Sequence, residues 1–156
     1  MNARVDISSF PVGQNIDYQG AEAVAALEAL TTEARAFVDS YRWAPPVEDL
    51  VLAFGVGPII GLYLMRFEPG GKQEDRERWV VVGDLPRMHF ETDEAPTPAL
   101  ALTRYCAIAG YWADNVLAGA DLSDSYPIEA APTPEHAEML NGRIDFILRE
   151  LVPLAV

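Results

Sequence analysis

The sequence has 156 residues, of which 24 are Asp or Glu and 11 are Lys or Arg, so its formal net charge is −13 at pH 7. Half of the residues are apolar and 10% are aromatic. This composition excludes a disordered chain, and a domain of this length buries a sizeable core. The acidic balance argues against binding to nucleic acid or to an anionic membrane, because phosphate groups would repel the protein.

The sequence contains no recognisable targeting or membrane segment. No apolar stretch follows Arg4, as a secretory signal would require. The longest uncharged run, residues 50–65, is shorter than the roughly 20 residues of a spanning helix, and glycines and Pro58 interrupt it. The single cysteine, Cys106, cannot form an intramolecular disulfide, which is compatible with a reducing compartment. We therefore expect a cytoplasmic protein.

The N-terminal half predicts an arm, a helix and a meander. Residues 1–19 have no clear period and predict an extended arm before a single domain over residues 20–156. From Glu22, apolar residues repeat at helical spacing as far as Tyr41, and Pro45-Pro46 ends this helix. Four apolar runs separated by Gly and Pro then predict an antiparallel meander of three to four strands, at residues 50–54, 59–67, 79–82 and 88–90.

Two of these runs are expected to be neighbouring inner strands. Neither residues 59–64 nor residues 79–82 alternate apolar with polar side chains, so both faces of the sheet need cover there. The charged segment 72–77 between them predicts a solvated hairpin tip.

The C-terminal half predicts two helices. Thr97-Pro98 and Thr133-Pro134 each provide an N-cap hydroxyl followed by a proline at the first helical position. The first helix is expected to stop at Gly119 and the second to continue to about Val152. The predicted fold class is therefore α+β, with an N-terminal helix, a three- to four-stranded antiparallel meander and two C-terminal helices.

Three segments carry a resemblance to a known group of proteins. Residues 79–86 (WVVVGDLP), 93–102 (DEAPTPALAL) and 132–140 (PTPEHAEML) resemble a group of small bacterial proteins without an assigned activity. This resemblance implies a bacterial protein and gives no residue a role. The layout is also similar to that of bacterial secretion chaperones and toxin-immunity proteins, which are often small, acidic and α+β, although a shared layout does not establish function.

The sequence gives little support for a metal site or a catalytic nucleophile. One cysteine and two histidines, His89 and His136, cannot supply the four ligands of a structural zinc site, and we predict neither a metal nor a cofactor. Cys106 lies at the flank of an apolar helix side, which favours a buried, inert thiol. No Gly-x-Ser-x-Gly sequence is present.

The densest carboxylates are Asp84, Glu91, Asp93 and Glu94. Asp84 ends an apolar strand, from which its side chain could reach the mouth of a cleft for acid–base chemistry or cation binding. The alternative is structural: Asp84 would bond the amides of its own turn, and Asp93-Glu94 would solvate a loop.

Charge and apolar patterns point to protein binding. Seven acidic residues and only two arginines lie between Asp17 and Asp49, and four acids without a base lie between Asp114 and Glu129. This pattern is typical of a solvated surface, or of a field that steers a basic partner. The outer sides of the two C-terminal helices carry a second apolar face. The alternative is that the N-terminal arm covers this face through Phe10, Val12 and Ile16. The candidates for an interface, with another copy in a homodimer or with a partner, are Leu100, Tyr111, Met139, Gly142 and Phe146.

The sequence thus predicts a non-catalytic, acidic protein-interaction module of a bacterial cytosol, with an immunity-like or chaperone-like role. The alternative is a small-molecule or metal-dependent enzyme built around Asp84 and the carboxylates of Glu91, Asp93 and Glu94.

Overall fold

The computed structural model describes residues 5–7, 10, 12–40, 47–68 and 77–156, with residues 12–19 described by their backbone alone. The order of elements confirms the predicted α+β class. In chain order the elements are α1 (Val12–Asp39), β1 (Val47–Val56), β2 (Ile60–Phe67), β3 (Glu77–Gly83), β4 (Met88–Glu91), α2 (Pro98–Leu117) and α3 (Pro134–Phe146). A π-helical turn, Ile147–Leu151, and a short 3-10 helix, Val152–Ala155, continue α3.

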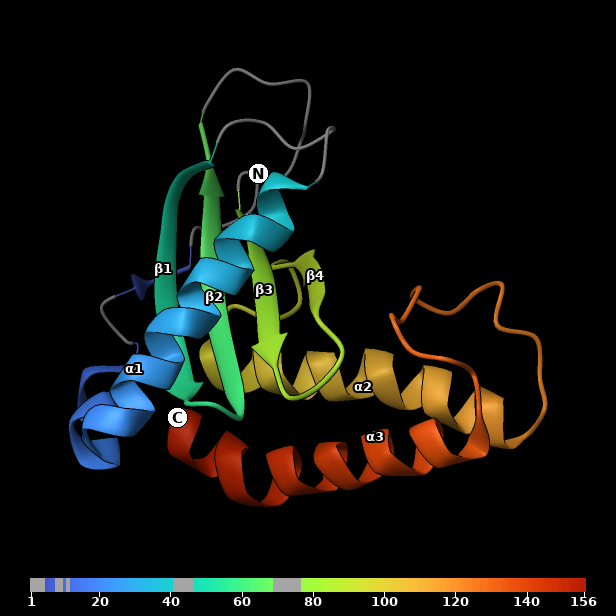
Figure 1. Cartoon of the computed structure of the whole chain (residues 1–156). Coiled ribbons are helices and arrows are strands. Elements are labelled where there is room, and N and C mark those ends of the chain that lie inside the picture. The colour runs from blue at the N-terminus through green and yellow to red at the C-terminus, as the bar shows by residue number, and fades with distance from the viewer. Residues whose placement is uncertain (1–4, 8–9, 11, 41–46, 69–76) are drawn as a thin grey trace.

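The four strands form one antiparallel sheet in the order β1-β2-β3-β4 (Figure 1). The inner strands β2 and β3 pair along their whole length, with Leu62 opposite Val81 and Tyr63 opposite Val80. These four side chains are fully buried, because helices cover both faces of the sheet. The prediction of two neighbouring inner strands is confirmed.

Helix α1 lies across one face of the sheet, and α2 and α3 lie against the other (Figure 1). The core consequently has two parts. The part under α1 contains Leu27, Leu30, Ala34, Phe37, Val38, Tyr63, Met65, Phe67, Val80 and Val82. The larger part lies under α2 and α3 and includes Leu62, Leu64, Trp79, Val81, Met88, Phe90, Leu102, Tyr105, Trp112, Leu140 and Ile144.

The contact between α1 and the turn that joins β1 to β2 depends on a glycine. A Cβ atom at Gly57 would lie 2.5 Å from the carbonyl oxygen of Ala23, so a larger residue would push α1 away from the sheet. Gly20 has φ +81° and separates the first residues of α1 from the rest of the helix. Residues 12–19 are helical and not the expected extended arm. The segment VGQNIDYQ contains few apolar residues, so no apolar period reveals this helix in the sequence.

The first described residues are tied to the end of the sheet. The Val5 N–H donates to Glu77 Oε2 at 3.0 Å, and Arg66 Nη2 donates to the Val5 carbonyl at 3.0 Å. Arg66 and Glu77 also form an ion pair at 2.9 Å, and both side chains are largely buried. Glu77 was expected in a solvated tip and is instead buried at the start of β3; the other residues of that tip, 72–76, lie outside the described residues.

The caps of the two C-terminal helices are confirmed. Thr97 Oγ1 accepts from the Leu100 N–H, and Thr133 Oγ1 accepts from the His136 N–H, each at 3.3 Å. The two caps thereby fix the residues at which α2 and α3 begin. Helix α2 ends before Gly119. The φ angle of Gly119 is +67°, a left-handed backbone conformation that favours glycine at the end of a helix.

Candidate functional site

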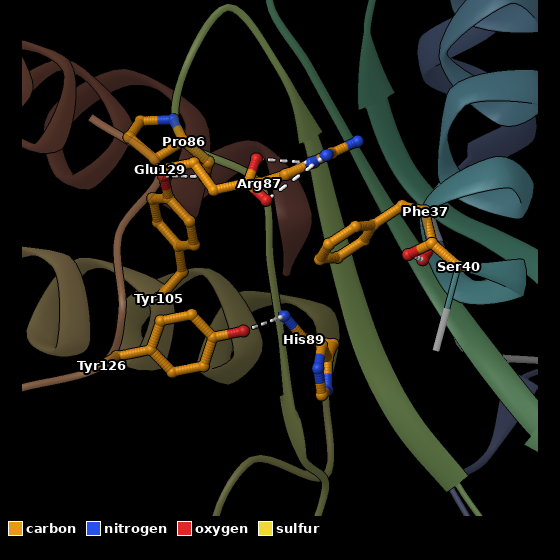
Figure 2. A network of polar contacts seen from close by, with 8 residues as sticks. All are labelled: Phe37, Ser40, Pro86, Arg87, His89, Tyr105, Tyr126 and Glu129. Carbon is orange, nitrogen blue, oxygen red and sulfur yellow. Dashed lines mark hydrogen bonds and ion pairs between the residues drawn. The ribbon is translucent and has the colours of Figure 1, made fainter. Parts of the chain in front are cut away.

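The loop between α2 and α3 covers the β4 edge of the sheet. The Tyr126 hydroxyl accepts a hydrogen bond from the His89 N–H at 3.2 Å, and Glu129 accepts two from Arg87, at 2.7 Å and 3.3 Å (Figure 2). An open edge strand leaves backbone N–H groups available to other chains. This loop occupies one of them on β4.

Helix α1 reaches the same edge through Phe37. Its ring lies 4.8 Å from the guanidinium carbon of Arg87 and 5.8 Å from the His89 ring, measured between centroids (Figure 2). The Tyr105 hydroxyl of α2 donates to the Pro86 carbonyl at 2.7 Å and holds the turn between β3 and β4. Residues far apart in the sequence therefore meet at this turn.

His89 is held in its neutral form. Its Nδ1 accepts a hydrogen bond from Arg78 Nε at 3.0 Å, which leaves the ring proton on Nε2. Burial, followed by the positive charge of Arg78, lowers the pKa of His89 to about 4. His89 is therefore uncharged at neutral pH, so it does not form an ion pair with a nearby carboxylate.

A cavity of about 500 Å³ opens beside this network. Its apolar wall comes from the β3–β4 turn, the end of the loop, α2 and α3, and consists of Leu85, Pro86, Trp112, Ala130, Met139 and Leu140. Its polar lining comes from α1, the same turn, the loop and α3, and consists of Glu33, Asp84, Arg87, Glu129, His136 and Arg143.

The arginines of this cavity are already neutralised. Arg143 Nη2 donates to Asp84 Oδ2 at 2.6 Å, and Arg143 Nε donates to the Asp84 carbonyl at 3.0 Å. Arg87 is bound by Glu129 at two points. Glu33 has no ion pair within the described part of the chain. The cavity therefore carries one uncompensated negative charge, located on the flank of α1.

The four carboxylates singled out in the sequence do not converge. Asp84 follows β3 and lines the cavity just described, whereas Glu91, Asp93 and Glu94 line a separate hollow of about 370 Å³. Antiparallel pairing explains this separation, because Glu91 lies opposite Arg78 at the start of β3. Glu94 also contacts Arg104 at 3.8 Å. Within the described residues, no group of three or more His, Cys, Asp or Glu side chains could hold a metal ion.

Asp84 has a structural role, as the alternative expected, but with partners outside its own turn. Its side chain binds Arg143 of α3, and its backbone N–H donates to the Ile59 carbonyl at 2.9 Å. Asp84 thus joins the end of β3 to α3.

The interface candidates fall in different places. Leu100, Gly142 and Met139 are exposed, and Met139, at 62% exposure, lines the cavity. Tyr111 is exposed in another hollow, where its hydroxyl donates to Asp124 Oδ2 at 2.8 Å. Phe146 is half-buried and packs against the larger core, so its expected outward position is not observed.

The C-terminal continuation of α3 also differs from the sequence expectation. The wider π-helical turn over Ile147–Leu151 departs from 100° per residue, which the sequence pattern assumed. In this turn Leu148 is 43% exposed, whereas Ile147 and Leu151 are buried. Phe10 packs against Trp79, with ring centroids 6.0 Å apart, rather than over the outer faces of the helices.

Cys106 is a free, buried thiol, as predicted. Burial raises its pKa to about 12, so the thiolate needed for nucleophilic attack is not formed at neutral pH.

No family model matches this sequence, and the searches of curated proteins and of solved structures also find no match. Among the described residues, no helix combines the length and apolar character needed to cross a membrane.

Proposed function

We propose that this protein is a non-catalytic interaction module of a bacterial cytoplasm that binds a basic protein. The observation that supports this proposal most directly is the unpaired acidic surface of α1. Glu22, Glu28, Glu33 and Asp39 are exposed, against a single exposed basic residue in this helix, Arg35. In the described part of the chain, arginine ion pairs engage carboxylates outside α1, namely Glu77, Asp84, Glu94, Glu129 and Asp145.

Uncompensated charges on one helix act together on an approaching partner. At physiological ionic strength, exposed charges remain effective over about 8 Å. The surplus of carboxylates on this helix therefore attracts a basic surface, raises the rate of encounter and repels acidic proteins, including another copy of this chain. The net charge of −13 adds to this field.

The enzyme alternative lacks comparable support. Asp84 lies in a different hollow from Glu91, Asp93 and Glu94. His89 is neutral and Cys106 stays protonated at neutral pH. The binding role is therefore the better supported of the two. In this role an immunity-like protein would cover a basic toxin, and a chaperone-like protein would hold a basic segment.

Affinity capture followed by a binding measurement tests this proposal. The full chain is used as bait in a lysate of the source organism, and each stoichiometric partner is purified and titrated by calorimetry. We expect a basic protein whose Kd rises by about tenfold or more between low and high salt. A variant with Glu22, Glu28 and Asp39 changed to the corresponding amides should bind more weakly.

The control carries Glu135→Gln, Glu138→Gln and Glu150→Gln, three changes on exposed residues of the C-terminal helices. It removes the same charge from another surface and should retain most of the affinity. A salt-independent partner, or equal weakening by both triple variants, would contradict the role of α1.

A further inference from the structure

We propose that the cavity beside the β3–β4 turn receives the side chain of a lysine or arginine from the basic partner. This inference rests on the proposed function and names the anchor point within it. Such a side chain combines an apolar stem with a cationic head, and the cavity offers complementary chemistry to each part.

The apolar wall fits the stem. Trp112 is 4% exposed and Leu140 is also 4% exposed, so both are held firmly by the core behind them. Met139 is 62% exposed on the same wall, and its flexible thioether adapts to the shape of a ligand. The volume of about 500 Å³ lies within the range of ligand cavities and leaves room for neighbouring residues of the partner.

The charges of the lining favour a cation. Arg87 and Arg143 are each bound by a carboxylate, so neither presents a free charge to an anion. Glu33 carries the uncompensated charge. The Asp84 side chain is 71% exposed and is held by Arg143 through Oδ2, which leaves Oδ1 to accept from a cationic head.

The position of Glu33 links the cavity to the acidic surface of α1. Glu33 belongs to the same helix as Glu22, Glu28 and Asp39, and it is the residue of this set that lines the cavity. A basic surface attracted by the helix would therefore meet the cavity at the end of its approach, where one side chain can enter.

Nuclear magnetic resonance of the full chain with labelled methionine methyl groups tests this inference. The probe is Nα-acetyl-lysine methylamide, and the matched control is the norleucine compound, which has the same stem without the ammonium group. We expect a saturable shift of the Met139 signal with the lysine probe, a much smaller one with norleucine, and none at Met65 or Met88, which are buried in the core.

Two variants complete the test. Glu33→Gln should weaken binding of the lysine probe by about threefold, as expected for loss of an exposed ion pair. Glu150→Gln removes an exposed charge outside both α1 and the cavity lining and should leave binding unchanged. Equal effects of both variants, equal shifts with norleucine, or a Met139 signal that does not respond would overturn the inference.

These outcomes separate the inference from the proposed function. Salt-dependent binding of a basic protein without a response of Met139 to lysine would leave the interaction module standing and exclude this anchor. Conversely, lysine binding in the absence of any basic partner would establish the cavity and remove the proposed function.

Discussion

Arg87 and Phe37 connect two opposite parts of the molecule, with 4.8 Å between the guanidinium carbon and the ring centroid. Phe37 belongs to α1 and is buried. Arg87 follows β3 and also binds Glu129 of the loop before α3. One guanidinium therefore holds α1, the sheet edge and the loop together, by a cation–π contact on one side and an ion pair on the other.

A double-mutant cycle should detect this ion pair. We expect Arg87→Gln and Glu129→Gln to be coupled by about 0.5–1 kcal/mol in the free energy of unfolding, because the pair is bidentate but partly exposed. Urea denaturation of the four proteins measures the coupling. The reference cycle is Arg149 and Asp145, an exposed pair four residues apart in one helix, for which about 0.3–0.5 kcal/mol is expected. A coupling of zero for Arg87 and Glu129 would show that the contact does not persist in solution.

The buried ion pair at the start of β3 should matter more. Glu77→Ala leaves Arg66 without its carboxylate and the Val5 N–H without its acceptor. Breaking a buried pair from one side costs about 3–5 kcal/mol, so the midpoint of chemical denaturation should fall sharply. Glu91→Ala, at an exposed position of β4, is the matched control and should change stability by less than about 0.5 kcal/mol. Similar effects of the two substitutions would show that Glu77 is not buried.

Local signals predicted the fold well. The caps at Thr97 and Thr133 require only neighbouring residues, and the inner strands are recognisable because both faces of each strand are apolar. Glu77 could not be placed in this way. It ends a charged run that is typical of a solvated tip, and only the contact with Arg66 and Val5 explains its burial.

The candidate site was largely beyond sequence reasoning. Asp84 was identified as a residue near a cleft, but its partner Arg143 lies 59 positions away. Arg87 and Glu129 are 42 positions apart and form no recognisable motif. Such pairs arise only when α3 and the loop before it pack against the β3–β4 turn, and no local pattern encodes these contacts.

His89 should make stability dependent on pH in the acidic range. Its pKa is lowered to about 4 in the folded protein, whereas an unfolded chain has the usual value near 6.5. As the pH falls from about 6.5 to about 4, the unfolded state takes up a proton more readily, so this contribution to folding stability is lost. The proton signals of the His89 ring should titrate with a midpoint about 4, and His89→Gln should flatten the stability profile in this range. A midpoint near 6.5, or an equal change from His136→Gln, would contradict the buried neutral state.

Two substitutions on α3 test the predicted self-association. Gly142→Ala should stabilise the folded chain by about 0.5–1 kcal/mol, because alanine favours the helix and no atom lies within 4 Å of the added Cβ. Phe146→Glu should destabilise it by a few kcal/mol, since the side chain packs against the core. Light scattering of both variants follows the oligomeric state. Loss of a dimer on Gly142→Ala would reveal a close approach of a second copy, whereas an unchanged mass would remove Gly142 from any interface.

The most direct test of the central claim is the association rate constant with the captured basic partner, measured by stopped-flow fluorescence over a range of salt concentrations. We predict that the rate constant falls steeply with ionic strength while dissociation changes little, because exposed carboxylates on α1 act mainly on the encounter. The amide variant of Glu22, Glu28 and Asp39 should show a slower association and a shallower salt dependence than the control with changes on the C-terminal helices. An association rate that is independent of salt, or identical in the two variants, would contradict the account.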